Sequence, residues 1–396
     1  MPVSVIISFL SSCAKSKTNR PSIKVMPITD VFYLICKYKQ IITNYPIFGA
    51  EIFVIMKKYF AFQWHITDQC DQRCRHCYIF ADRNHKICET KWQNLTQTLD
   101  NIVDMSHRMN RLPYLYITGG DPILHPRFWD LLQLIHSKNI PFTLMGNPFH
   151  LDLDVCEKMY SLGCQKYQLS LDGLRQTHDH FRKSGSFDLT LQKIPIIKAS
   201  GIRCSIMTTV SEENIAEIPD LIDVIVENKV DVWSFARYCP TDYKSVNNQG
   251  VAPLAYRDFL DKCWAKFTKY KDSKTTFNLK EHLWTLYLYE EGWWKIPQSA
   301  DRYTIYGGCH CGDCHFTITA DGRLMACRRF DSDVGSYDQN MYEVFYGKKM
   351  NYYRQYDKFE KCQRCELLRF CRGCPAVSYG YSGSYYAPDP QCWKEV

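Results

Sequence analysis

Short apolar runs alternate along most of the chain with longer segments in which apolar residues recur every three or four positions. The short runs have the length of buried β-strands and lie at residues 60–67, 114–119, 142–147, 167–173, 204–210 and 232–237. The segments between them have the period of α-helices and lie at residues 90–109, 127–138, 152–162, 187–200 and 214–228. Because strands that alternate with helices form parallel sheets through right-handed crossovers, the pattern predicts an α/β fold.

The predicted strands are almost continuously apolar, which is typical of a parallel sheet that is covered on both faces and is closed or nearly closed. We therefore expect a partial (β/α)6 TIM-like barrel. In such barrels the loops that follow the carboxyl ends of the strands carry the chemistry. Several polar and cysteine-containing motifs fall at these ends, which supports the barrel prediction.

The barrel pattern ends near residue 250, where an aromatic-rich stretch of helical period begins. From residue 307 the alternation stops and a glycine-punctuated, cysteine-rich tail follows. The predicted segments are an N-terminal extension at 1–55, a barrel at 56–245, a helical bridge at 246–306 and a small α+β domain at 307–396.

The first 55 residues are expected to lie outside the catalytic fold. Their apolar stretch "VSVIISFLSS" has no basic residue before it and is too short to span a bilayer, which argues against a signal peptide and a transmembrane helix. Met56 is followed by "KKYFAFQWHIT", which reads as a natural start that leads into the first strand.

Cysteine usage narrows the class of protein more than charge does. The net charge of +7 is spread along the chain, so we expect no nucleic-acid partner and no membrane partner. The 20 cysteines are unevenly placed, and nine of them lie between Cys309 and Cys392. In a chain of 396 residues, clustered CxxC pairs favour bound metal over disulfides, and therefore a reducing cytoplasm.

The stretch "DQCDQRCRHCYIF" at 68–80 places Cys70, Cys74 and Cys77 in a CxxxCxxC pattern after the first predicted strand. A structural zinc site needs four ligands, and His76 or His65 is the alternative fourth ligand here. Iron–sulfur cubanes usually take four thiolates. Three thiolates therefore leave one iron open to another ligand.

With this loop after the first barrel strand, the sequence resembles the radical S-adenosylmethionine (SAM) superfamily. The resemblance implies a 4Fe–4S cluster on Cys70, Cys74 and Cys77, with SAM bound to the open iron through its amino and carboxylate groups. It also implies one-electron cleavage of SAM to a 5′-deoxyadenosyl radical. The catalytic acid or base is not identified by any motif.

Further motifs match this family at strand ends. In "YITGGDPILHP" the resemblance places Gly119, Gly120 and Asp121 at the methionine amino group of SAM, although the family most often has Glu at the third position. The other positions that the resemblance assigns to SAM are Ser170 and Asp172 of "LSLDG", Arg182, His76 and Arg237.

The tail is similar to the SPASM module, which carries auxiliary iron–sulfur clusters. "TITADGRLMAC" predicts a hairpin that turns at Asp321-Gly322. The resemblance implies a first cluster on Cys309, Cys314, Cys327 and Cys374, with Cys311 able to replace Cys309. It implies a second cluster on Cys362, Cys365, Cys371 and Cys392. Paired zinc in a ribbon or treble-clef module is the alternative.

SPASM-bearing enzymes commonly modify ribosomally made peptides, and "FQWHITDQCDQRCRHCYIF" looks like members encoded beside Ala-Cys-Gly repeat peptides. The resemblance thus implies a Cys-rich peptide substrate, thioether or other crosslink formation, and an electron donor such as flavodoxin or ferredoxin. The alternatives are an anaerobic sulfatase-maturase-like enzyme, a small-molecule radical SAM oxidoreductase, and a non-catalytic Fe–S or zinc protein.

Overall fold

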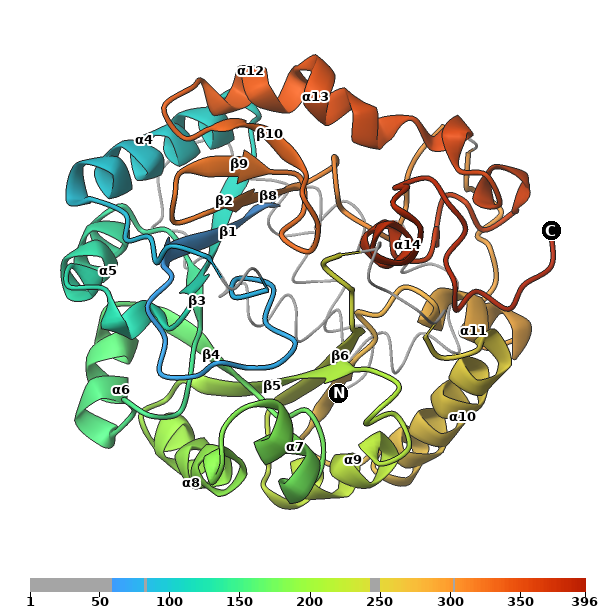
Figure 1. Ribbon diagram of the computed structural model, residues 1–396, viewed down its shortest axis with the longest axis horizontal. Coiled ribbons are helices and arrows are strands. Elements are labelled where there is room, and N and C mark those ends of the chain that lie inside the picture. Colours follow the sequence, from blue (N-terminus) through green and yellow to red (C-terminus); the bar gives the residue numbers. More distant parts are fainter. Residues whose placement is uncertain (1–58, 82–83, 243–249, 302) are drawn as a thin grey trace, which may run out of the picture.

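The computed structural model describes residues 59–81, 84–242, 250–301 and 303–396, and within them a single ten-stranded sheet curves into a partial barrel (Figure 1). The strands are β1 (Tyr59–Thr67), β2 (Leu112–Gly119), β3 (Phe142–Met145), β4 (Cys164–Ser170), β5 (Arg203–Val210), β6 (Val232–Arg237), β7 (Thr276–Asn278), β8 (His315–Ile318), β9 (Arg323–Met325) and β10 (Asp333–Ser336). Their order across the sheet is β10-β9-β8-β1-β2-β3-β4-β5-β6-β7. The predicted extension at 1–55 lies outside the described residues.

Helices form the outer ring of the barrel in Figure 1. They are α4 (Trp92–Arg108), α5 (Phe128–Ser137), α6 (Leu153–Ser161), α7 (Arg175–Phe181), α8 (Ser186–Ala199), α9 (Ile218–Glu227), α10 (Pro253–Lys269), α11 (Trp284–Glu290), α12 (Met341–Tyr346), α13 (Lys348–Asn351) and α14 (Pro375–Ser382). Single 3-10 turns lie at η2 (Pro122–Leu124), η3 (Tyr352–Arg354), η4 (Tyr356–Lys358) and η5 (Cys362–Arg364). Within the described ranges, no helix is both long and apolar enough to cross a bilayer.

The predicted α/β barrel is confirmed: all six expected strands are present, and β1 to β6 pair in parallel with their neighbours. The helices follow the expected period, as α4 shows by burying Leu95, Leu99 and Ile102 on one face. The short helix α7 was not predicted. In the bridge, which looked helical throughout, β7 adds a further parallel strand next to β6.

The two faces of the sheet differ, which the near-continuous apolar runs did not predict. On β1, Phe60 packs against Phe345 of the outer helix α12, so Phe60 faces outward. Because successive side chains of a strand point to opposite faces, the alternate residues Gln63 and His65 face the barrel interior. The register continues this inner row across the sheet through Thr317, Gln63, Tyr116, Thr143, Lys166 and Arg203. The interior is therefore polar, as suits a site for chemistry.

The tail continues the barrel sheet. Strand β8 pairs in parallel with β1, with Ala61 opposite His315. It then pairs antiparallel with β9 through the predicted hairpin, and Gly322 in the turn has a φ of +91°. The division of the chain into a barrel, a bridge and a tail domain stays a prediction, because one sheet runs through all three.

A buried ion-pair cluster joins the end of β6 to the bridge and the tail. Arg237, which is 4% exposed, lies 2.9 Å from a carboxylate oxygen of Glu281 and 2.6 Å from one of Asp389. Its Nη1 also donates to the side-chain oxygen of Gln391 at 2.8 Å. Removing one partner of such a cluster leaves the other charges buried and uncompensated.

We expect Arg237→Met to lower the free energy of unfolding by about 3–5 kcal/mol, because Glu281 and Asp389 lose their buried counter-charge. Chemical denaturation of the iron-loaded protein, followed by circular dichroism, measures this loss. The matched control is Arg127→Met, which breaks the exposed pair with Asp130 and should cost at most about 1 kcal/mol. Equal losses in both variants would contradict a linking role for Arg237.

Candidate functional site

The three cysteines of the CxxxCxxC loop form one group between β1 and α4. The loop folds back on itself through a backbone hydrogen bond from Cys77 N to Cys74 O of 3.0 Å. Burial raises the pKa of all three thiols, and in each case a second thiol of the loop raises it further. Thiols that oppose one another's ionisation in this way suit a cationic metal cluster, which binds thiolates and compensates their charge.

Hydrogen-bond donors lie close to two of these three thiols. The Asn147 side-chain amide donates to Cys70 Sγ at 3.2 Å, and Arg182 Nη1 lies 3.8 Å from Cys74 Sγ. Asn147 follows β3 and carries no motif, so the sequence did not identify it.

The glycines of "YITGGDP" hold the start of the cysteine loop against the end of β2. A Cβ at Gly119, whose φ is +152°, would lie 2.0 Å from the carbonyl oxygen of Thr67, and one at Gly120 would lie 2.2 Å from that of Gln69. Gly120 N donates to Thr67 O at 2.8 Å, and Asp121 N donates to Gln69 O at 2.6 Å. The close approach that requires these glycines is thus to the protein backbone, whereas the sequence suggested an approach to the ligand.

Asp121 is a buried carboxylate that no charged side chain neutralises at ion-pair distance within the described residues. It is 0% exposed, and neither carboxylate oxygen accepts a hydrogen bond of standard geometry from these residues, although the backbone N–H groups of Asn147 and Ile123 approach closely enough to lower its pKa slightly. Burial raises its pKa to about 7, although the nearby His150 lowers it in part. His150 itself pairs with Asp71 at 2.5 Å. A buried, unpaired carboxylate is costly unless a cationic ligand completes it, so this position fits an ammonium group.

Three further predicted residues come together at the ends of β4 and α7. Arg182 Nε lies 2.5 Å from Asp172 Oδ2, and His76 Nε2 lies 3.3 Å from the same oxygen. The backbone N–H of Thr209 donates to the other carboxylate oxygen at 2.8 Å. Burial alone would raise the pKa of Asp172, but Arg182 and His76 outweigh it and hold the pKa below its usual value.

This trio lies beside the cysteine loop, because Arg182 also faces Cys74. Ser170 ends β4 on the same inner face as Lys166. His178 was not predicted, but its ring accepts the backbone N–H of Asp172 at 3.1 Å.

Arg237, in contrast, is not brought into this group. Its donors face Glu281, Asp389 and Gln391, so the geometry gives no support to a contact with SAM.

The tail cysteines form two groups. Cys311 N donates to Cys309 Sγ at 3.4 Å, and the Cys311 and His282 side chains lower the pKa of Cys309. Burial raises the pKa of Cys327 and of Cys374, and Cys309 contributes to each increase. The other predicted set is Cys362, Cys365, Cys371 and Cys392, and its role as a ligand set stays a prediction. Burial raises the pKa of Cys362 to about 12, with further contributions from Cys392 and Cys365, and Cys362 and Cys392 act on Cys371 likewise.

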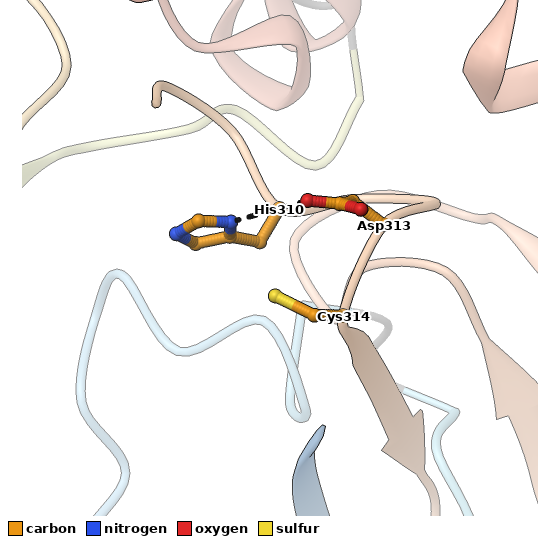
Figure 2. A group of neighbouring side chains, drawn as sticks. All are labelled: His310, Asp313 and Cys314. Atoms are coloured by element: carbon orange, nitrogen blue, oxygen red, sulfur yellow. Dashed lines mark ion pairs between the residues drawn. The ribbon is translucent and has the colours of Figure 1, made fainter. Parts of the chain in front are cut away.

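Cys314, a predicted ligand of the first auxiliary cluster, has two further potential metal ligands beside it. Figure 2 shows it beside His310 and Asp313, with the ligand atoms of all three within 4.8 Å of one another. The His310 ring lies 3.9 Å from Asp313 Oδ2, and the negative charge of Cys314 raises the pKa of His310. Cys311 lies next to Cys309, and whether Cys309 or Cys311 binds the first auxiliary cluster together with Cys314, Cys327 and Cys374 stays a prediction.

Comparison with known proteins agrees with this geometry. Residues 64–225 match the Radical SAM superfamily. The AdoMet-dependent heme synthase of Nitratidesulfovibrio vulgaris is 23% identical over 339 residues, which are 83% of this chain and 90% of the relative. Residues 64–225 therefore form a radical SAM domain.

Solved structures share the fold. That of Streptococcus suis SuiB bound to the precursor peptide SuiA has a TM-score of 0.67 at 16% identity and covers 99% of this chain and 88% of SuiB. That of anSMEcpe with bound AdoMet has a TM-score of 0.67 at 18% identity and covers 84% of this chain and 94% of that chain. The partial barrel with a cysteine-rich C-terminal region is thus a known architecture.

We expect Gly120→Ala to lose about four iron atoms per chain, those of one cubane, because the added Cβ would displace the backbone of the cysteine loop. Iron analysis of the anaerobically reconstituted protein measures the loss. Gly292→Ala is the control, since Gly292 also has a positive φ, of +73°, but a Cβ there would meet nothing within 4 Å. A full iron load in the Gly120→Ala protein would contradict the expected displacement.

Proposed function

We propose that this radical SAM enzyme modifies a ribosomally synthesised, Cys-rich peptide, with formation of a thioether or another crosslink. Cys70, Cys74 and Cys77 would hold the 4Fe–4S cluster to which SAM binds. When bound, this pair supplies the 5′-deoxyadenosyl radical that removes a hydrogen atom from an unactivated carbon. The observation that carries the SAM assignment is the buried Asp121 carboxylate, which accepts no hydrogen bond of standard geometry from the described residues and lies close enough to Cys70 to raise the pKa of that thiol.

The remaining residues have distinct roles in this proposal. Asp121 accepts hydrogen bonds from the ammonium group of SAM, while Gly119 and Gly120 fix its distance from the loop. Asp172 holds Arg182 in place, and that guanidinium would pair with the carboxylate of SAM. His76 and Ser170 line the adenosine side. Arg237, although also assigned to SAM by sequence, acts through the ion-pair cluster instead.

The tail groups would each hold an auxiliary cluster, on the predicted cysteines with Cys311 as the alternative ligand in the first. Cationic side chains lie close to these cysteines and would stabilise negatively charged thiolates. Arg329 Nη1 donates to Cys374 Sγ at 3.2 Å, and Arg372 Nη2 donates to Cys309 O at 2.7 Å. Forming a thioether removes two hydrogens from the peptide. One leaves as a hydrogen atom to the radical, the thiol loses a proton, and the remaining electron passes to an auxiliary cluster. A flavodoxin or ferredoxin would supply reducing electrons.

A peptide substrate is supported by the likeness to SuiB with its bound precursor peptide, which extends over 99% of this chain. A small-molecule substrate is the second candidate. It is supported by the heme synthase of N. vulgaris, which matches 83% of the chain and 90% of its own length.

We expect Asp121→Asn to weaken SAM binding about tenfold or more, because a hydrogen-bonded charge pair becomes a neutral contact. Anaerobic equilibrium dialysis of the reconstituted protein gives the dissociation constant. Asp121→Glu tests whether the longer side chain, which is usual in the family, also serves. The exposed Asp100 offers a control, Asp100→Asn, whose affinity should match the wild type. Unchanged affinity in Asp121→Asn would exclude the proposed contact.

The reconstituted, reduced protein should release 5′-deoxyadenosine from SAM, and Cys77→Ala should not. Liquid chromatography measures the product. Cys88→Ala removes a thiol outside the three groups and should retain the activity. An iron-loaded wild type that forms no product would refute the proposal. With an Ala-Cys-Gly repeat peptide added, mass spectrometry should detect the loss of two hydrogens per thioether bond.

A further inference from the structure

Two cations of the barrel interior have no carboxylate partner. Within the described residues, neither Arg328 nor Lys280 forms an ion pair. Two other cations of the site are paired with carboxylates, Arg182 with Asp172 and Arg237 with Glu281 and Asp389, while Arg329 and Arg372 donate to the thiol of Cys374 and to backbone carbonyls. An uncompensated charge inside a protein is costly, and a ligand of opposite charge is one way to compensate it.

Arg328 lies between the cysteine loop and the first group of tail cysteines. Its backbone follows Cys327 of the tail, and its side chain donates to the side-chain oxygen of Gln63 on the inner face of β1. The guanidinium carbon lies 5.7 Å from the centre of the Tyr78 ring, and Tyr78 directly follows Cys77. Its Nε is buried and has no hydrogen-bond partner within the described part of the chain.

Lys280 approaches the same place from the bridge. Its neighbours in sequence are held by the barrel and the tail, since Glu281 binds Arg237 at the end of β6 and His282 interacts with Cys309 of the tail. Burial lowers the pKa of Lys280 to about 7, and the charge of Arg328 makes the largest further contribution to the decrease. Lys280 is nevertheless exposed. A lysine that is surrounded by protein and still accessible faces an internal space.

We propose that Arg328 and Lys280 form a subsite for a carboxylate of the substrate, in the barrel interior between the cysteine loop and the first tail group. This proposal rests on the proposed function, because it places that carboxylate near the carbon that loses hydrogen. The planar guanidinium offers a carboxylate two parallel donors, and the ammonium adds a point charge. The carboxylate of SAM has its own cation, Arg182, beside the cysteine loop.

Two sources would supply the same chemistry. One is a peptide, through an acidic side chain or its C-terminus. The other is a small polycarboxylate, such as an iron porphyrin with propionate arms. Both would place a carboxylate on Arg328 and Lys280, and the experiment separates them by its probes.

The test is anaerobic binding to the reconstituted holoenzyme. One pair of probes is an Ala-Cys-Gly repeat peptide with a free C-terminus and its C-terminal amide, and the other is iron coproporphyrin III and its tetramethyl ester. We expect the wild type to prefer the free acid of one pair about tenfold or more. Arg328→Gln and Lys280→Gln should each reduce this preference to about twofold or less, whereas Arg328→Lys and Lys280→Arg should retain part of it.

The control is Arg323→Gln on the exposed hairpin, where Arg323 pairs with Asp321, and its preference should equal that of the wild type. A wild type without preference for either free acid overturns the proposal. So does a preference that survives in both glutamine variants at full iron content, or that is lost equally in the conservative variants. The 5′-deoxyadenosine assay reports separately on the proposed function, so a protein that cleaves SAM without a carboxylate preference refutes only the subsite.

Discussion

The pairing of β1 on both of its edges is the constraint on which the rest of the structure depends. One edge pairs with β2, whose end carries Asp121, and the other pairs with β8 at the start of the tail hairpin. The cysteine loop leaves the carboxyl end of the same strand. A single strand therefore fixes the positions of the cysteine loop, Asp121 and the tail relative to one another. The glycines at the end of β2 allow its backbone to lie in direct contact with the backbone at the start of the cysteine loop.

The distribution of charge inside the protein follows from this frame. Where the barrel needs stability, as at Arg237, charges are buried with their partners. Within the described residues, Asp121 and Arg328 differ from this: neither carboxylate oxygen of Asp121 has a donor of standard geometry, and the buried Nε of Arg328 has no acceptor. The cost of burying such polar groups is offset when a ligand of opposite charge binds them.

The sequence predicted the parts of the molecule that are encoded locally. Strand and helix periods are local, and the cysteine loop and the Gly119-Gly120-Asp121 turn are contiguous motifs at strand ends, so both could be recognised. Lys280 carries no motif. Glu281 and Asp389 are far from Arg237 in the sequence, so no local pattern could predict that they pair with it. Cys311 and Cys314 are separated by two residues, and only the fold of the turn decides which of them approaches Cys309.

The pairing of Ala61 with His315 also has a consequence for synthesis on the ribosome. Because the N-terminal part of the chain is synthesised first, β1 to β6 can assemble by successive crossovers before the tail exists. One edge of β1 stays unpaired until β8 has been synthesised. Contacts between such distant residues form slowly, and an unpaired edge strand invites association with other chains. The nascent barrel thus passes through a stage in which its cysteine loop is present while the adjoining edge of β1 is open, and an exposed edge at that stage favours aggregation.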